Sequence, residues 1–191
     1  MISHIILASK SPRRRELLAL LNIPFDVLTA DTDEQTALKN PADIVAELAK
    51  RKADTIFQKY PAETENELVL SADTIVVLGE TILNKPASHD DAVRMLSLLQ
   101  GQTHHVFTGF SLKKADKQIT DFEVTEVTFS PMSAEEIQTY IEVAKPFDKA
   151  GAYGIQDDFG ACFIEKINGC YYNVVGLPVS KLYKTLKLFQ D

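Results

Sequence analysis

The sequence predicts an α/β protein built on a mixed sheet. Over the first half of the chain, short apolar runs typical of strands alternate with amphipathic helical patterns, which favours strands joined by helices. The segment 102–130 instead predicts two long strands around a turn at 115–117, an antiparallel hairpin. Because both kinds of connection occur, the sheet should contain both parallel and antiparallel strands.

The 191 residues suit a single domain spanning 1–191, with two lobes around a cleft as the alternative arrangement. A net charge of −7 argues against a general nucleic-acid or membrane-surface binder, although a few convergent cations can still hold a phosphate substrate. No apolar run approaches the ~20 residues that span a bilayer, and the order of apolar and basic residues at the start is the reverse of a signal peptide. Cys162 and Cys170 should stay as thiols, which fits a cytoplasmic protein.

The first half of the chain predicts three strands and two helices. Both helices should begin with a capping residue followed by proline, whose missing N–H group is not needed in the first helical turn. The third strand, LVLSADTIVVL, is rich in Val, Leu and Ile and should be buried on both faces. The expected elements are a strand at 5–8, a helix from Ser11-Pro12 to about 22–24, a strand at 25–28, a helix from Asn40-Pro41 through Phe57, and a strand at 68–78.

The second half predicts helices with polar caps around the central hairpin. Ser88 with Asp91, and Ser133 with Glu136, have the spacing by which side chains cap the first turn of a helix. An Asn-Gly pair is typical of a two-residue hairpin turn. The expected elements are a helix from Ser88 to Gly101, the strands within 102–130, a helix from Ser133 through Ile141, a hairpin at Asn168-Gly169, and a closing helix that buries Val179, Leu182, Tyr183 and Leu186.

The segment Ser9-Lys10-Ser11-Pro12-Arg13-Arg14-Arg15, here named the phosphate cradle, is the first candidate site. A strand that runs into a capped helix offers free backbone N–H groups and the positive end of the helix dipole. Hydroxyls, a lysine and three arginines add side-chain donors for phosphates. The alternative is that Ser11 only caps the helix and the arginines form a solvated face. The segment is not a Walker A loop, because it lacks glycines.

Asp73 is the second candidate, because it lies inside an otherwise apolar strand. Burying a carboxylate is costly unless it is paired or binds a cation. Beside a phosphate site, such a carboxylate can hold Mg²⁺ or accept a proton from an attacking water. The alternatives are an aspartate at a strand end or a strand boundary that differs from the predicted one.

Weaker signals come from the turn residue Lys85, from Glu34, and from Lys52, which lies one helical turn after Leu48. A solvated side chain is the favoured explanation of Lys85 in its turn, and a snorkelling side chain explains Lys52 as well as a residue pointing into a cleft does. The segment FDKAGAYGIQ, residues 147–156, places two glycines close together, as backbone that approaches a ligand or adopts positive φ requires. An ordinary connecting turn explains it as well.

Taken in order, LASKSPRRRELL, SADTIVV, NKP, GQTHHVFTG, FDKAGAYGIQ and INGCYYNVVGLP resemble the Maf family of nucleotide pyrophosphatases over nearly the whole chain. The resemblance implies an α/β, Maf/ITPase-like fold: a two-lobed mixed sheet with long curved strands, helices on both sides and a central cleft. It also implies a homodimer, and metal-dependent hydrolysis of a nucleoside triphosphate at the α-phosphate.

The resemblance also implies roles for individual residues. Asp73 matches the family's catalytic carboxylate, and Glu34 matches a second carboxylate on the metal side, for Mg²⁺ or Mn²⁺. The other candidate site residues match positions linked to substrate choice or positions that line the nucleotide cleft. Ser11 and Arg14 are candidate substrate-binding residues because they belong to the phosphate cradle. The substrate-choice positions are Arg13, Thr74 and Gln156, and the cleft positions are Ser9, Lys52 and Lys85.

The GAYGIQ segment looks like the branch of the family that acts on dTTP and UTP, and lacks the Phe-Lys version of the 7-methyl-GTP branch. The Gln156 amide carries a donor and an acceptor side by side, which complement the N3–H and carbonyl of uracil and thymine. A flipped amide would read cytosine, so CTP stays open. Lys145 departs from the glutamate that family members often carry, which puts local electrostatics or the dimer contact in doubt.

Two other functions stay open on the sequence. The same fold can act on purine or modified nucleotides as a house-cleaning enzyme, or the chain can be a nucleotide-binding regulator of cell division without turnover. Asp73 favours an enzyme, because a carboxylate beside phosphates weakens simple anion binding unless a metal intervenes.

Overall fold

The computed structural model describes residues 2–157 and 159–189. Among these residues, seven strands form one sheet in the order β2-β1-β3-β5-β6-β7, with β4 paired to β3. The β1 strand is parallel to β2 and β3, whereas β4 is antiparallel to β3 and β7 is antiparallel to β6. The predicted mixed α/β class is therefore confirmed. The strands are β1 (Ile5–Ala8), β2 (Phe25–Leu28), β3 (Leu68–Leu78), β4 (Thr81–Leu83), β5 (Thr103–Lys113), β6 (Gln118–Phe129) and β7 (Ile164–Asn168).

The predicted capping residues begin the helices. Ser11, Asn40, Ser88 and Ser133 each accept a hydrogen bond from a backbone N–H group of the first turn, and Ser133 forms a full capping box with Glu136. The helices are α1 (Pro12–Ala19), α2 (Pro41–Lys59), α3 (Pro61–Thr64), α4 (His89–Leu99), α5 (Ala134–Ala144), α6 (Tyr171–Val175) and α7 (Val179–Leu186), with 3₁₀ turns at Ala150–Ala152, Gly160–Phe163 and Lys187–Phe189.

The chain folds into two compact units. The first contains Met1–Asp73, Thr108–Glu123 and Gly176–Asp191, and the second contains Thr74–Phe107 and Val124–Val175. Consequently β3, β5 and β6 contribute residues to both units.

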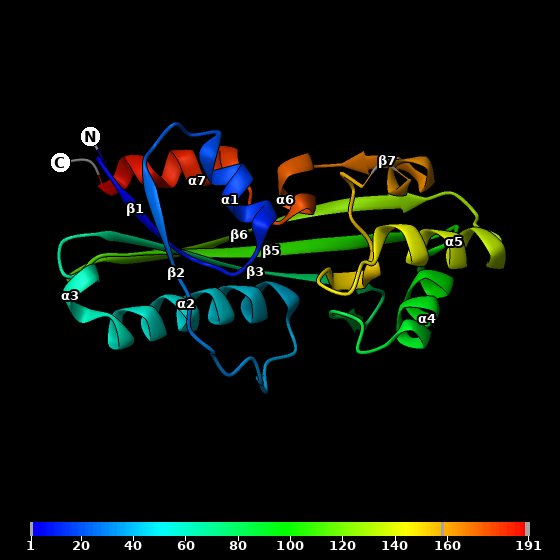
Figure 1. Cartoon of the computed structure of the whole chain (residues 1–191), viewed down its shortest axis with the longest axis horizontal. Coiled ribbons are helices and arrows are strands. Elements are labelled where there is room, and N and C mark those ends of the chain that lie inside the picture. Colours follow the sequence, from blue (N-terminus) through cyan, green and yellow to red (C-terminus); the bar gives the residue numbers. More distant parts are fainter. Residues whose placement is uncertain (1, 158, 190–191) are drawn as a thin grey trace. The chain divides into compact units, whose positions relative to one another are not determined.

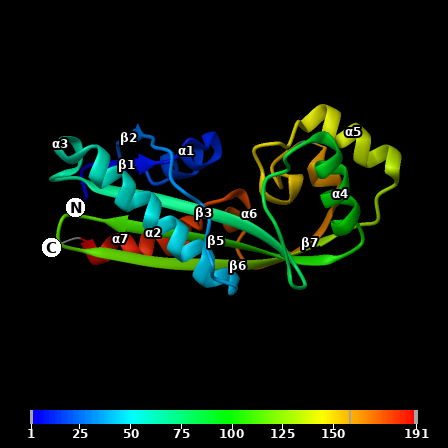
Figure 2. The same ribbon diagram turned by 90° about the horizontal axis from the view of Figure 1, so that it is seen from below.

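In the first unit, α2 and α7 cover opposite faces of the strands, as Figures 1 and 2 show together. The apolar face of α2 packs on β1 and β3, as the sequence pattern predicts. The buried residues of this contact are Ile6, Ala8, Ala53, Ile56 and Val69.

Gly109 lets β5 and α2 come into close contact within the first unit. A Cβ atom added at Gly109 would lie 2.3 Å from the carbonyl oxygen of Val45 on α2, well inside contact distance. No side chain fits in that space, so glycine at this position sets how closely the helix lies on the strand.

In the second unit, α4 and α5 lie side by side (Figure 1). Their apolar faces share a core with residues of β3 to β6. Gly151 has a φ of +71°, which is one of the two conditions that the sequence pattern indicates for this segment, and it lies against the side chain of Val76. The larger buried residues of this core include Leu83, Leu96, Leu99, Phe129, Tyr140 and Ile141.

The prediction of a hairpin at Asn168-Gly169 is wrong, because among the described residues no strand returns from this turn to pair with β7. The β7 strand pairs with β6, with Ile167 opposite Val127, and the chain after Gly169 enters α6. The reason lies in β6: the Thr125 hydroxyl accepts a hydrogen bond from the Cys170 N–H (3.0 Å) and donates one to the Cys170 carbonyl (3.2 Å). These contacts occupy the backbone groups that a returning strand would pair with β7.

Two smaller expectations also need correction. The first helix ends at Ala19 and not near 22–24, because the N–H groups of residues 20–22 bond three residues back and not four, and Asn22 then adopts a φ of +52°. In α7, Val179, Leu182 and Leu186 are buried as predicted, but Tyr183 is 51% exposed and Thr185 is buried in its place.

Both cysteines are free thiols, as predicted. Among the described residues, no helix combines the length and the apolar character that crossing a bilayer requires.

Replacing Gly109 with alanine should lower the free energy of unfolding by about 1–3 kcal/mol, because the added methyl group meets helix backbone that cannot rotate away. Urea unfolding measures this change. Lys114→Ala, at an exposed position just beyond β5, is the matched control and should stay within about 0.5 kcal/mol of the wild type. Equal stability of the two variants would show that α2 is not held against β5 at this point.

Candidate active site

The site begins where β1 ends beside β3 in the first unit. These strands run parallel, with Ala8 opposite Ser71 as their last pair. Ser9 follows β1 directly, and Asp73 lies two residues beyond Ser71, so both side chains lie past the last paired residues. Each residue is only 7% exposed. The strand register therefore brings a buried hydroxyl and a buried carboxylate to the same edge, where parallel α/β sheets bind their ligands.

Lys52 neutralises the buried carboxylate. Its Nζ lies 2.5 Å from Asp73 Oδ1 and 2.7 Å from Glu34 Oε1, so one ammonium group joins two carboxylates. The Lys52 side chain is 17% exposed and that of Asp73 is 11% exposed, whereas Glu34 is 54% exposed. The Lys52–Asp73 contact is therefore the shielded part of this cluster, and it supplies the partner that a carboxylate in an apolar strand requires.

The phosphate cradle is held by hydrogen bonds of its own. Ser9 Oγ accepts from the Ser11 N–H (3.1 Å), and Ser11 Oγ accepts from the Arg14 N–H (3.5 Å), so the hydroxyls order the start of α1. Arg14 Nε donates to the carbonyl oxygen of Gly176 at 2.9 Å. Gly176 belongs to the NVVGLP segment. The sequence pointed to this segment only through the resemblance to the Maf family, and Gly176 was not among the predicted site residues.

The cradle and the acidic cluster act on each other electrostatically. Burial lowers the pKa of the Arg14 guanidinium; the negative charge of Asp73 opposes this shift, Arg13 adds to it, and Glu34 opposes it. The structure therefore brings Asp73, Glu34, Lys52, Arg13 and Arg14 together in one local field.

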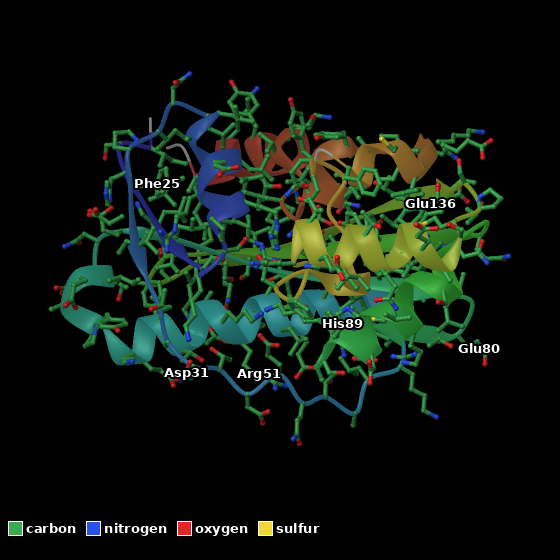
Figure 3. The ribbon with its side chains drawn as sticks, turned by 45° about the vertical axis from the view of Figure 1, so that its right-hand side comes forward. Phe25, Asp31, Arg51, Glu80, His89 and Glu136 are labelled. Carbon is green, nitrogen blue, oxygen red and sulfur yellow. The ribbon has the colours of Figure 1, made fainter. Side chains whose placement is uncertain are left out.

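The loop that carries Glu34 is held by a residue that the sequence analysis missed. Arg51 Nη1 donates to the carbonyl oxygens of Asp33 (2.7 Å) and Gln35 (2.8 Å), on either side of Glu34. Figure 3 shows Arg51 on α2 above this loop, which begins near Asp31. Arg51 is also paired with Glu47, one turn earlier on α2. The i,i+4 spacing of that pair was visible in the sequence, but the loop carbonyls as partners were not.

Thr74, Lys85 and Gln156 belong to the second unit. Thr74 follows Asp73 along β3 and is half-buried, Lys85 is exposed after β4, and Gln156 is exposed in a turn. Their roles in substrate choice and binding stay predictions.

The segment before Gln156 is anchored by a buried hydrogen bond. His104 Nε2 lies 2.8 Å from the Tyr153 hydroxyl, and both rings make edge-to-face contacts with Phe129. Burial, with a smaller effect of the neighbouring His105, lowers the pKa of His104 from 6.5 to about 4. His104 is therefore neutral at pH 7 and acts as a fixed hydrogen-bonding partner of Tyr153.

The donor set around Lys52 fits a divalent cation in part. Asp73 and Glu34 already converge on one cation, the Lys52 ammonium group. Mg²⁺ is commonly bound through one or two carboxylates, with substrate phosphate oxygens and water completing its shell. Over residues 2–157 and 159–189, no group of three or more His, Cys, Asp and Glu side chains is arranged for a metal. These two carboxylates thus suit a metal that arrives with a phosphate ligand.

A family model described as "Maf-like protein" matches residues 4–189 of the chain. A dTTP/UTP pyrophosphatase of Chlorobaculum tepidum is 51% identical, with 98% of this chain and 96% of the relative covered. A dTTP/UTP pyrophosphatase of Bacillus cereus is 46% identical, with 97% and 95% covered. A solved nucleoside-triphosphatase, dITP/XTP pyrophosphatase, of Mycobacterium abscessus has a TM-score of 0.47 and 8% identity, with 98% of each chain covered. That structural similarity is too low to support a functional argument.

Removing Lys52 should destabilise the chain through Asp73. Lys52→Met leaves a buried carboxylate without its ion-pair partner and should cost roughly 2 kcal/mol of unfolding free energy, reduced from the fully buried case because the charge of Arg14 also acts on Asp73. In Asp73→Asn the charge is gone, and Lys52→Met should then cost much less. A double-mutant cycle by urea unfolding should give a coupling of about 1–3 kcal/mol, and additive effects would contradict the pairing.

Acid should destabilise the chain partly through His104. Its folded pKa of about 4 lies below the ordinary 6.5, so the unfolded state binds the extra proton, and stability falls as the pH drops from 6.5 towards 4. Between pH 7 and pH 5 this residue should account for about 2 kcal/mol of lost stability. His104→Gln keeps a polar partner for Tyr153 but does not titrate, so its stability should fall less over that range. If the unfolding free energies of the wild type and of His104→Gln fall equally between pH 7 and pH 5, His104 is not the cause of the acid sensitivity.

Proposed function

The chain belongs to the Maf-like protein family, and we propose that it is a nucleoside triphosphate pyrophosphatase that hydrolyses dTTP and UTP at the α-phosphate, releasing pyrophosphate. The relatives named dTTP/UTP pyrophosphatase, at 46–51% identity over nearly full length, support this substrate class. The observation that carries the proposal is the buried Asp73 carboxylate, held by Lys52 within the field of the arginines of α1.

The phosphates are bound by the phosphate cradle. The first turn of α1 supplies backbone N–H groups and the positive end of its dipole, and Arg13 and Arg14 add side-chain cations. Ser9 and Ser11 already order that turn. This local positive field explains how a chain with a net charge of −7 can hold a triphosphate.

Asp73 is the residue that acts on the attacking water. A water oxygen attacks the α-phosphorus, the bond from that phosphorus to the bridging oxygen breaks, and pyrophosphate leaves. Asp73 accepts the proton of the water, and Lys52 fixes the direction of its carboxylate. A Mg²⁺ or Mn²⁺ ion held by Asp73 and Glu34 would neutralise charge that develops on the leaving pyrophosphate.

The proposal also gives roles in substrate recognition to three residues of the second unit. Gln156 reads the pyrimidine edge through its amide, with Thr74 as a further position of substrate choice and Lys85 as a phosphate ligand. Because a flipped amide also fits cytosine, CTP is a candidate substrate. A house-cleaning role in the nucleotide pool, a homodimeric state and a cytoplasmic location belong to the same proposal, and the family resemblance supports them.

The second candidate function is a nucleotide-binding regulator of cell division without turnover. Such a protein gains nothing from an acidic pair beside its phosphate site, because the carboxylates repel the ligand unless a metal intervenes. Tight binding of UTP, with no pyrophosphate released in Mg²⁺ or Mn²⁺, would favour it over the enzyme.

Asp73→Asn should lower the rate of pyrophosphate release from UTP by about three orders of magnitude or more, because the proton acceptor and a metal ligand are lost together. The folded state should persist, since Lys52 keeps its ion pair with Glu34 when the Asp73 charge is lost. Asp54→Asn is the matched control: Asp54 is also ion-paired, to Lys50 and Lys113, but is not part of the cluster around Lys52. A near-normal rate in Asp73→Asn would remove this residue from the mechanism.

A panel of UTP, dTTP, CTP, ATP, GTP and 7-methyl-GTP, assayed for pyrophosphate in Mg²⁺ and in Mn²⁺, tests the substrate class. UTP and dTTP should show a kcat/KM at least about tenfold above that of the purine nucleotides, because a hydrogen-bonded base edge supplies discrimination of at least that size. A preference for a purine nucleotide would overturn the pyrimidine assignment while leaving the pyrophosphatase reaction in place.

A further inference from the structure

Gln156 sits in a tight turn of the second unit. The Asp157 N–H donates to the Gly154 carbonyl oxygen at 3.2 Å, which closes a four-residue turn with Gln156 in its third position. Ile155, in the second position, is buried, and Gln156 is exposed. The turn therefore buries the Ile155 side chain and exposes that of Gln156. The direction of the Gln156 side chain depends on how the two ends of the turn, Gly154 and Asp157, are held.

A single hydroxyl group holds both ends of this turn. The Tyr140 O–H donates to Asp157 Oδ2 at 2.9 Å and accepts a hydrogen bond from the Gly154 N–H at 3.0 Å. Tyr140 is 1% exposed on α5, and its ring makes an edge-to-face contact with Phe163. A phenol can donate its proton and also accept through its oxygen, so one hydroxyl group can make both of these bonds.

Lys149 supports the carboxylate that Tyr140 contacts. Its Nζ lies 3.5 Å from Asp157 Oδ2 and 3.3 Å from Asp148 Oδ1, and its side chain is 11% exposed. The Asp157 carboxylate, itself 18% exposed, therefore has a hydrogen bond and an ion pair on the same oxygen. Charge-assisted contacts of this kind are stronger than neutral ones, so Asp157 is a firm anchor for its end of the turn.

The packing around the turn leaves no room for a side chain at Gly154 or at the nearby Gly160. A Cβ atom at Gly154 would lie 2.7 Å from both carboxylate oxygens of Asp157. One at Gly160 would lie 2.7 Å from the Gly154 carbonyl oxygen and 3.2 Å from Cε2 of Tyr140. Both glycines are needed because the turn, the carboxylate and the tyrosine ring are in direct contact, and such contacts keep a turn in one conformation.

We propose that Tyr140 is a positioning residue for base selectivity, because its hydroxyl fixes the two ends of the turn that presents Gln156. This inference rests on the proposed function, in which the Gln156 amide reads the pyrimidine. An amide distinguishes one base edge from another only when its donor and acceptor are held in register with that edge. Tyr140 has no contact with the base in this scheme and acts through the backbone of the turn.

Tyr140→Phe tests the inference, since it removes the hydroxyl and leaves the buried ring. The kcat/KM ratio of UTP over GTP should fall about tenfold, mainly through a higher KM for UTP, with kcat changed less than about threefold. Asp157→Ala removes the other partner of the bond and should give the same loss. Asp157→Asn keeps an oxygen that accepts from Tyr140 and should restore most of the selectivity.

Tyr60→Phe is the matched control. It deletes a tyrosine hydroxyl in the first unit that donates to the Thr29 carbonyl at 3.0 Å, and it should leave the UTP/GTP ratio unchanged. Thermal unfolding of every variant is measured in parallel, so that a loss of folded protein is recognised. If Tyr140→Phe does not fold, the comparison of Asp157→Ala with Asp157→Asn gives the same test.

The outcomes separate this inference from the proposed function. A wild-type protein that releases no pyrophosphate overturns the proposed function, and one that prefers GTP overturns its pyrimidine assignment; either result overturns the inference as well. A wild type that prefers UTP, together with a Tyr140→Phe variant that keeps its UTP/GTP ratio within about twofold, overturns the inference alone. An equal loss of kcat for both nucleotides with a lower Tm also overturns it, because that pattern indicates a structural role only.

Discussion

The ion pair between Asp73 and Lys52 is the interaction on which this structure depends. Asp73 is buried in β3, a strand rich in apolar residues, where an unpaired carboxylate would oppose folding, and Lys52 Nζ lies 2.5 Å from it. The pair requires α2 to lie close to the sheet, and the contact of Gly109 with the Val45 carbonyl permits that approach. The same lysine reaches Glu34, so the position of one helix sets the geometry of both carboxylates.

Around this pair, the candidate site is held by side chains whose own partners are fixed. Arg51 holds the backbone on both sides of Glu34, and the serines of the cradle hold the first turn of α1. In the second unit, Tyr140 holds the turn of Gln156 in a comparable way. Residues that order the groups in contact with a ligand reduce the rearrangement needed at binding and reaction, which is how preorganised sites act.

Local signals in the sequence predicted the local structure well. Ser11, Asn40, Ser88 and Ser133 began helices because a cap depends only on the next few residues. The hairpin at Asn168-Gly169 was wrong because an Asn-Gly pair specifies a bend, whereas the path beyond it was set by a distant threonine of β6. Asp73, Lys52 and Glu34 were each identified from the sequence, but their shared contact depends on tertiary packing. The hydroxyl of Tyr140 was missed because its helical spacing marks it only as a core residue.

A crystal structure with a non-hydrolysable UTP analogue and Mn²⁺ tests the central claim most directly. The account predicts that a carboxylate oxygen of Asp73 lies on the metal or on the water that faces the α-phosphorus, with the phosphates against the first turn of α1. A triphosphate bound away from both, with Asp73 still in contact only with Lys52, would contradict it.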